Sequence, residues 1–359
     1  MAKATTRRDF VKQVAAGVAT FMVPPALSNP ALPEQAYASG GPPRNLFIMG
    51  WDGAGLNNVR PMLEDGTLKH LKRFINRQGG RLCPLESHSK TNTVSGWAQC
   101  FTGLTYDQSG IMGNKRYGGN GLLTSQEIID SRSPRSGIYR YFDFWVTQLP
   151  YERFFVKYLQ DAGSKVGWVV SKHHLGKDKR GRTTDSPFKH VIENVDFYSL
   201  YSPRSPDSDP DKGGDKDNYI LKMKRDAINF IKTTPEPWVL FVLTDPDYYG
   251  HRYNENGQRY LDEFVRSDDL FGRLLSSIDL SNTIVIVTAD HGFDEGTLGH
   301  QDADDIWMVT NLPVHSAYVD QRNQKAFGSM RDLAPTVLRY YDIDYSSFIP
   351  RLRGKSLLE

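Results

Sequence analysis

The sequence contains little of several features that would indicate a particular class of protein. Its 359 residues include only two cysteines, Cys83 and Cys100, and neither lies in a zinc-type cysteine spacing. An excess of one charge is also missing, because 44 basic residues stand against 42 acidic residues, for a net charge of +2. This balance gives no general attraction to nucleic acid or to an anionic membrane. Any attraction for an anionic ligand must therefore be local.

Beyond its first forty residues the chain has no transmembrane-length apolar run and no internal repeat, so we expect no stable membrane anchor. The length allows one large α/β domain or two small ones. A hydrophobic content of 39% and an aromatic content of 12% are enough for a sizeable core. The two cysteines could form a disulfide in an oxidising compartment or stay as buried free thiols, and the sequence leaves both open.

The first 38 residues are typical of a targeting segment. Residues 6–12, Thr-Arg-Arg-Asp-Phe-Val-Lys, resemble the twin-arginine export signal. A modest apolar stretch follows at 14–23, and Ala-Tyr-Ala at 36–38 offers a cleavage site of the small-x-small type. We therefore predict export by the twin-arginine machinery, cleavage after Ala38, and a single periplasmic or secreted domain at 39–359.

Three apolar runs are predicted to be buried strands, and each ends in side chains that can bind a metal ion. These side chains are Asp52 after the run 45–51, Asp247 and His251 after the run 238–244, and Asp290 and His291 after the run 283–287. In an open α/β sheet, ligands bind in the loops at the carboxyl ends of the strands. Each Asp or His alone could belong to an ordinary polar turn. Their repetition at three strand ends favours a site for divalent cations.

Thr93 lies where a loop is predicted to lead into a helix that ends at Gly103. A threonine in this position can simply cap the helix. It can also act as a nucleophile, because a helix N-terminus favours an alkoxide and an incoming phosphate. Ionising its hydroxyl near neutral pH would require a bound divalent cation, so this second interpretation depends on metal ligands elsewhere in the chain.

Several short motifs occur in a recognisable order along residues 45–357. They are Thr93, Thr-Gly-Leu-Thr at 102–105, Ser-Gly-Ile at 109–111, Asn-Lys-Arg-Tyr at 114–117, Pro-Asp-Tyr-Tyr-Gly-His at 246–251, Ala-Asp-His-Gly at 289–292, Asp-Leu-Ala-Pro-Thr at 332–336 and Gly-Lys-Ser-Leu at 354–357. This set resembles the alkaline phosphatase superfamily, and most of all its type I phosphodiesterase/nucleotide pyrophosphatase branch. Ser95-Gly96-Trp97 departs from the Pro-Asn-His of that branch.

The resemblance implies an α/β fold with a central, mostly parallel sheet, helices on both faces and a cap inserted at about 115–235. It also implies two divalent ions, with zinc favoured by the three imidazoles and manganese as the alternative. The ligands it implies are Asp247, His251 and His300 for one ion, and Asp52, Asp290, His291 and Thr93 for the other. His315 is a weaker alternative to His300.

The same resemblance implies roles for two further groups. Thr93 would attack phosphorus and form a phosphothreonine. Asn114, together with the amide of Val94, would hold a non-bridging oxygen of the substrate. An ordinary turn residue in Gly113-Asn114 is the plainer interpretation of this asparagine.

The expected substrate is a small-molecule phosphate ester, with phosphodiester or nucleotide pyrophosphate bonds favoured. Lys172 and His174 follow a predicted strand at 165–171, and their spacing loosely resembles basic pairs in monoesterases and phosphonoacetate hydrolases of the superfamily. They are candidate substrate-binding residues, or else part of a solvated strand exit. A phosphomonoesterase and a hydrolase of phosphonates or sulfate esters are therefore alternatives.

Two other classes of protein are consistent with the same motifs. One is a phosphotransferase or mutase of this fold, although mutase-like members use a serine nucleophile and carry a larger insertion. The other is a catalytically silent metal-binding protein, which would be expected to lack a ligand or the nucleophile.

Overall fold

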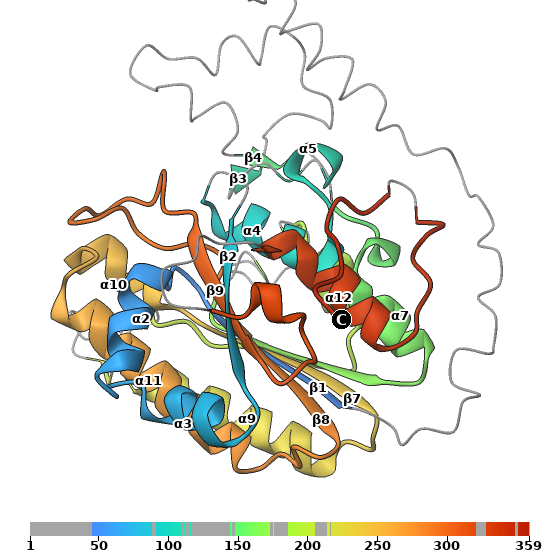
Figure 1. Ribbon diagram of the computed structural model, residues 1–359, viewed down its shortest axis with the longest axis horizontal. Coiled ribbons are helices and arrows are strands. Elements are labelled where there is room, and N and C mark those ends of the chain that lie inside the picture. The colour runs from blue at the N-terminus through green and yellow to red at the C-terminus, as the bar shows by residue number, and fades with distance from the viewer. Residues whose placement is uncertain are drawn as a thin grey trace, which may run out of the picture.

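The computed structural model describes residues 45–87, 91–109, 111, 115–116, 144–145, 148–172, 175, 186–204, 214–215, 217–320, 328–348 and 351–358. Within this part of the chain an eight-stranded sheet runs between helices that cover both of its faces (Figure 1). The predicted α/β class is confirmed. The targeting segment, Asn114 and His174 lie outside the described residues.

The strands of the sheet follow the order β10-β2-β9-β8-β1-β7-β5-β6. Their bounds are β1 Asn45–Trp51, β2 Arg81–Glu86, β5 Lys165–Val170, β6 Phe197–Leu200, β7 Trp238–Thr244, β8 Thr283–Thr288, β9 Asp305–Thr310 and β10 Gly328–Ser329. Strand β9 is antiparallel to both of its neighbours, and all other pairs in the sheet are parallel. Two short strands, β3 Lys115–Arg116 and β4 Phe144–Trp145, pair with each other.

The central strands β1, β7 and β8 are buried along their whole length. A parallel strand that is covered on both faces has a continuous run of apolar residues in its sequence, and for this reason the three strands could be predicted. In the register of the sheet, Gly50 of β1 lies opposite Leu243 of β7 and Thr288 of β8. The three strands therefore end at the same level, and the polar residues that follow them emerge side by side.

One group of helices covers each face of the sheet (Figure 1). On one face lie α2 Leu56–Glu64, α3 Lys69–Arg77, α9 Asn218–Thr233, α10 Pro246–Tyr253 and α11 Gln258–Leu275. On the other lie α4 Thr93–Thr102, α7 Phe155–Asp161 and α12 Leu333–Tyr340. The shorter helices are α5 Tyr106–Ser109 and α8 Lys189–Asn194, with 3₁₀ turns at η2 Tyr151–Arg153, η6 Ser316–Tyr318 and η7 Met330–Asp332.

A cluster of aromatic rings joins α4 to the sheet. Phe101 of α4 lies 4.9 Å from Trp168 of β5 and 4.9 Å from Phe241 of β7, measured between ring centroids. Trp97, one turn earlier in α4, lies 5.3 Å from Phe241. All four side chains are buried. Because Thr93 begins this helix, the aromatic cluster fixes the position of the candidate nucleophile.

Strands β5 and β6 change the description of the predicted cap. Both lie within the range 115–235, and both belong to the main sheet, where β5 pairs with β7 and β6 pairs with β5. Residues 165–170 and 197–200 therefore form part of the sheet layer. Apolar strand residues such as those of 165–170 are better explained by a buried sheet position than by a surface cap. A cap in the remaining part of the range stays a prediction.

The two cysteines are buried and free. Burial raises the pKa of the Cys83 thiol to about 12, and burial likewise raises the pKa of Cys100. Thiols held neutral in this way are poor nucleophiles and poor metal ligands. In the described part of the chain no helix is both long and apolar enough to cross a bilayer.

We predict that Phe101→Ala destabilises the protein by about 3–5 kcal/mol, because the change leaves a cavity in a closely packed aromatic cluster. Urea unfolding of the mature chain, followed by tryptophan fluorescence, would measure this loss. Leu221→Ala in α9 is the control, since Leu221 is 50% exposed and its removal should cost little. Equal losses in the two variants would contradict the role given to the cluster.

Candidate metal centre

The ends of β1, β7 and β8 bring the predicted metal ligands together. Asp52 directly follows β1, and its backbone oxygen accepts a hydrogen bond of 2.9 Å from the amide of Asp247. Asp247 lies in the first turn of α10, and His251 follows one helical turn later, so that both face the same side. Asp290 and His291 come directly after the buried Ala289 at the end of β8.

Two groups of side chains have their ligand atoms within 4.8 Å of one another, namely Asp247, His251 and His300, and Asp52, Asp290 and His291. In the first group, the Nε2 atoms of His251 and His300 lie 3.3 and 3.6 Å from the same oxygen of Asp247. In the second group, Nε2 of His291 lies 3.6 Å from Asp290 and 3.8 Å from Asp52. The first group has the same residues as the first ligand set that the family resemblance implies, and the second group has those of the second set without Thr93.

The donor atoms of these groups fit divalent cations. Among the described residues, Oδ2 of Asp52, Oδ1 of Asp247, Oδ2 of Asp290 and Nε2 of His291 are buried without a hydrogen-bond partner. An unpaired buried polar atom is costly. Nε2 of His291 lies 3.6 Å from Oδ2 of Asp290 and 4.0 Å from Oδ1 of Asp247. Unpaired atoms of these types, so close together, are explained if cations lie between them.

Backbone carbonyls orient two of the imidazoles. Nδ1 of His251 lies 2.8 Å from the oxygen of Leu298, and Nδ1 of His291 lies 2.9 Å from the oxygen of Gly292. Since a carbonyl oxygen can only accept, we assign the ring proton to Nδ1 in both residues. This leaves the lone pair of each Nε2 directed toward the carboxylates, as metal binding requires.

Burial dominates the pKa shifts of Asp290, His291 and His300, whereas the charges of Lys172 and His251 outweigh burial and hold the pKa of Asp247 well below its usual value. Burial raises the pKa of Asp290 to about 8 and lowers the pKa of His291 to about 4. Burial also lowers the pKa of His300 to about 3. These directions are the expected ones when charged forms lose their hydration. A bound cation would reverse them for the carboxylates and compensate the imidazole lone pairs.

Thr93 is the first residue of α4 and is 2% exposed. Its hydroxyl lies 3.3 Å from Oδ1 of Asp52, so it borders the second ligand group. The helix N-cap is Asn92, whose side chain makes no capping hydrogen bond. Thr93 is therefore placed beside the ligands at the positive end of the helix, where a nucleophile or a metal ligand would be needed.

Lys172 has a different environment from the one its position after a strand suggested. Its side chain is 3% exposed. Its Nζ atom lies 2.5 Å from Oδ2 of Asp247, 2.9 Å from Oδ1 of Asp245 and 3.3 Å from Oδ1 of Asp52. The ammonium is thus directed at three carboxylates rather than at solvent.

Sequence reasoning missed three residues that shape this site. Asp245 caps α10 through a 3.0 Å hydrogen bond from the amide of Tyr248, and the Asp-Pro pair at the helix start is a signal that could have identified it. Gly53 has a φ of 73°, and its amide donates to Asp290 over 3.0 Å. Gly96 lets α4 approach β8, because an added Cβ would lie 3.0 Å from Cβ of Asp290.

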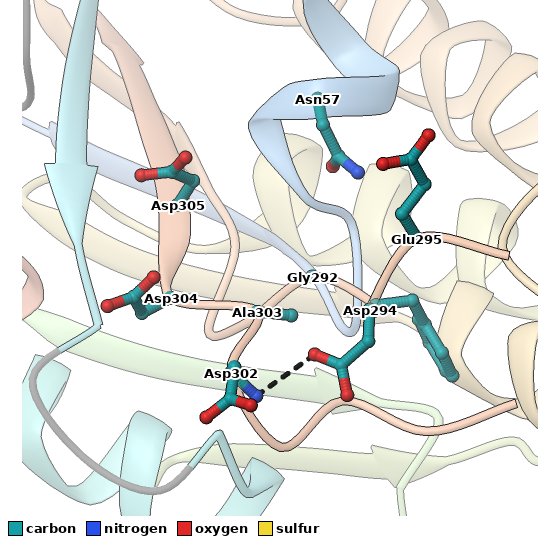
Figure 2. A pocket seen from close by; sticks show the side chains of 9 residues that line it. Asn57, Gly292, Asp294, Glu295, Asp302, Ala303, Asp304 and Asp305 are labelled. Carbon is teal, nitrogen blue, oxygen red and sulfur yellow. Dashed lines mark hydrogen bonds between the residues drawn. The ribbon is translucent and has the colours of Figure 1, made fainter. Parts of the chain in front are cut away.

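Asp294 anchors the loop that carries His300. Its carboxylate accepts hydrogen bonds from the amides of Gln301 and Asp302, over 2.8 and 2.9 Å, and Figure 2 shows the bond to Asp302. His315, the alternative to His300, is exposed and lies in none of the ligand groups. Its Nδ1 instead accepts a hydrogen bond from the amide of Ala317.

A pocket of about 400 Å³ lies beside this loop (Figure 2). Its lining includes five carboxylates and no basic residue: Asn57, Gly292, Phe293, Asp294, Glu295, Asp302, Ala303, Asp304 and Asp305. Negative charge of this density repels a phosphate group. The pocket is therefore not where the phosphoryl group of a substrate binds, and the metal centre is the better candidate.

A protein-family model matches most of the chain. The sequence model of the type I phosphodiesterase/nucleotide pyrophosphatase family matches residues 46–326. This range includes every proposed metal ligand and Thr93.

Curated relatives match over a shorter stretch. The chain is 28% identical over 125 residues to a 2,3-bisphosphoglycerate-independent phosphoglycerate mutase from Antithamnion sp., covering 34% of this chain and 24% of the mutase. It is 32% identical over 124 residues to the enzyme of the same name from Metamycoplasma hominis, with the same coverage of 34% and 24%. The matched region thus spans about a quarter of the length of these relatives.

Solved structures share the fold at low sequence identity. A putative sulfatase from Bacteroides thetaiotaomicron aligns with a TM-score of 0.55 and 12% identity, over 88% of this chain and 74% of its own. The zinc complex of the C-terminal periplasmic domain of EptC from Escherichia coli aligns with a TM-score of 0.50 and 13% identity, over 89% and 88% of the two chains. At these identities the likeness concerns the fold alone.

We predict that Zn²⁺ added to metal-free protein raises the melting temperature by about 5 °C or more, because binding to the native state alone stabilises it. Asp290→Asn should reduce the shift, since it removes one charged ligand. His315→Ala is the matched control and should keep the full response. Differential scanning calorimetry would measure the melting temperatures of all three proteins. An unchanged melting temperature of the wild-type chain on addition of Zn²⁺ would contradict the metal centre.

Proposed function

The chain belongs to the type I phosphodiesterase/nucleotide pyrophosphatase family of the alkaline phosphatase superfamily, and we propose that it hydrolyses phosphodiester or nucleotide pyrophosphate bonds through a phosphothreonine formed on Thr93. Family membership makes it a metal-dependent hydrolase of phosphoric esters. The observation that carries the finer proposal is the buried hydroxyl of Thr93 at the N-terminus of α4, beside Asp52.

The proposed site holds two divalent ions, with zinc as the first candidate because three imidazoles take part. Asp247, His251 and His300 would bind one ion, and Asp52, Asp290, His291 and Thr93 the other. When bound, such ions stabilise negative charge on phosphoryl oxygens and lower the pKa of a coordinated hydroxyl.

The residues of the chain have distinct tasks in this proposal. Thr93 attacks phosphorus in line with the leaving oxygen, and the bond to that oxygen breaks as the phosphothreonine forms. The first turn of α4 favours the negative phosphoryl oxygens, because the positive end of the helix faces them. The Val94 amide and Asn114 would hold one non-bridging oxygen. Water then hydrolyses the phosphothreonine and restores the hydroxyl.

The placement of Lys172 favours a diester over a monoester. A phosphate monoester carries an additional negative charge near neutral pH. Its binding is therefore favoured by a nearby cationic side chain that has a free hydrogen-bond donor. The ammonium of Lys172 instead faces Asp52, Asp245 and Asp247. Nζ donates a hydrogen bond to Oδ2 of Asp247, and the carboxylates of Asp245 and Asp52 lie 2.9 and 3.3 Å away, so the ammonium is directed at protein carboxylates. We therefore do not propose that Lys172 contacts the substrate.

Two parts of the proposal concern the protein as a whole. The mutases among its relatives are named for an intramolecular phosphoryl transfer, so transfer to an acceptor other than water is the second candidate.

We further propose that the twin-arginine machinery exports the chain and that the mature enzyme acts in the periplasm or outside the cell.

We predict that the zinc-loaded mature protein prefers bis-p-nitrophenyl phosphate to p-nitrophenyl phosphate by at least about tenfold in kcat/KM, or ~1.4 kcal/mol in transition-state binding. Initial rates of nitrophenolate release for the two compounds would measure this preference. A monoester preference of the same size would contradict the proposed substrate class but not the hydrolase assignment.

We predict that Thr93→Ala lowers kcat by roughly a thousandfold or more, because loss of the nucleophile removes the covalent route. Thr93→Ser should keep measurable turnover and trap ³²P from labelled substrate on acid quench. Thr102→Ala is the matched control, since Thr102 is a buried threonine at the other end of the same helix. Normal turnover by a folded Thr93→Ala variant would exclude the mechanism.

A further inference from the structure

A third group of carboxylates overlaps the two ligand groups of the metal centre. Asp52, Asp245 and Asp247 are buried, and their oxygens lie within 4.8 Å of one another. Such a group could by itself hold a metal ion. In this chain the position among the three carboxylates is already occupied, because Nζ of Lys172 lies 2.5–3.3 Å from each of them.

The sheet determines that the lysine lies there. Strand β5 is parallel to β7, with Val170 opposite Leu243. The amide of Ser171 continues this pairing with a 3.0 Å hydrogen bond to the oxygen of Leu243. Lys172 therefore emerges at the level of Asp245, at the same edge of the sheet as the metal ligands. The position of Lys172 therefore follows from the register in which β5 pairs with β7.

The ammonium of Lys172 offsets part of the negative charge of the three carboxylates. A buried ammonium without such partners would be strongly unfavourable. The three carboxylates would repel one another equally strongly without a cation.

We infer that the ammonium of Lys172 permanently occupies a third cation position, so that the chain binds two divalent ions and excludes a third. This inference rests on the two-ion site proposed above. The observation behind it is a buried carboxylate triad whose centre is filled by a covalently attached cation. The ligand class that would enter in its absence is a small, hard divalent ion such as Mg²⁺, because all donors are carboxylate oxygens.

The filled position also orients Asp247. Oδ2 of Asp247 faces Lys172, while Oδ1 faces the Nε2 atoms of His251 and His300. The lysine thus holds one oxygen of this carboxylate so that the other is presented to the first metal ion. Asp245 is not a ligand of either proposed ion. Its carboxylate instead forms an ion pair with Lys172 and accepts a hydrogen bond at the N-terminus of α10.

Metal counting on the intact mature chain tests the inference. Wild-type protein would be loaded with Zn²⁺, dialysed against buffer with millimolar Mg²⁺, and analysed by inductively coupled plasma mass spectrometry. We expect two ions per chain for wild type and three for Lys172→Ala, with Mg²⁺ as the additional ion. Lys172→Arg keeps the charge and should stay at two. Lys165→Ala is the matched control, because Lys165 starts the same strand but pairs with Asp196 at the surface.

The melting temperature provides a second test that does not depend on counting metal ions. Mg²⁺ added to the zinc-loaded Lys172→Ala variant should raise its melting temperature, while wild type and Lys165→Ala should not respond. A wild-type chain with three ions would overturn the inference. So would a folded Lys172→Ala variant that binds two ions and shows no thermal response to Mg²⁺.

Asp245→Asn keeps the inference testable if Lys172→Ala does not fold. Asp245 is not a proposed ligand of either ion, so this variant should still bind two metal ions per chain. If it instead bound one ion fewer than wild type, Asp245 would be a metal ligand, and the inference would be overturned. A wild-type count below two is a distinct result. It would contradict the proposed two-ion site, and the inference that rests on it, whatever the variants show.

Discussion

The repulsion among buried carboxylates at one edge of the sheet is the constraint on which the rest of this structure depends. Asp52, Asp245, Asp247 and Asp290 are all buried at the ends of adjacent strands. Burial of four acids so close together is unfavourable unless cations compensate them. The chain supplies one cation itself, in Lys172, and arranges imidazole lone pairs around the remaining oxygens for ions taken from solution.

The surrounding fold keeps these groups at fixed distances. The aligned ends of β1, β7 and β8 set the level of the carboxylates, and the backbone bond from Asp247 to Asp52 joins two of the ends. Gly53 and Gly96 permit approaches that a larger side chain would block. The aromatic cluster beneath α4 then holds Thr93 against Asp52. A preorganised site of this kind does not have to rearrange when a charged substrate arrives.

The same charge balance bears on the choice of substrate. With the donors of Lys172 directed at carboxylates, the described part of the site offers a phosphoryl group metal ions and a helix N-terminus, but no lysine donor. The neighbouring pocket is acidic and repels phosphate. This arrangement supports the proposed preference for a phosphoryl group of low charge, and that proposal fits the type I phosphodiesterase/nucleotide pyrophosphatase family, whose sequence model covers most of the chain.

The sequence by itself determined the fold class, the central strands and the residues at their ends, because a buried parallel strand is a continuous apolar run and local order along the chain is enough to recognise it. The family resemblance also implied His300 in preference to His315. Only the tertiary structure decided that β5 and β6 belong to the sheet, that Asp245 joins the cluster, and that Lys172 points at carboxylates. Those features depend on which strands become neighbours and in which register. Pairings between residues far apart along the chain, such as Lys172 with Asp247 at a separation of 75 positions, leave no local signal in the sequence.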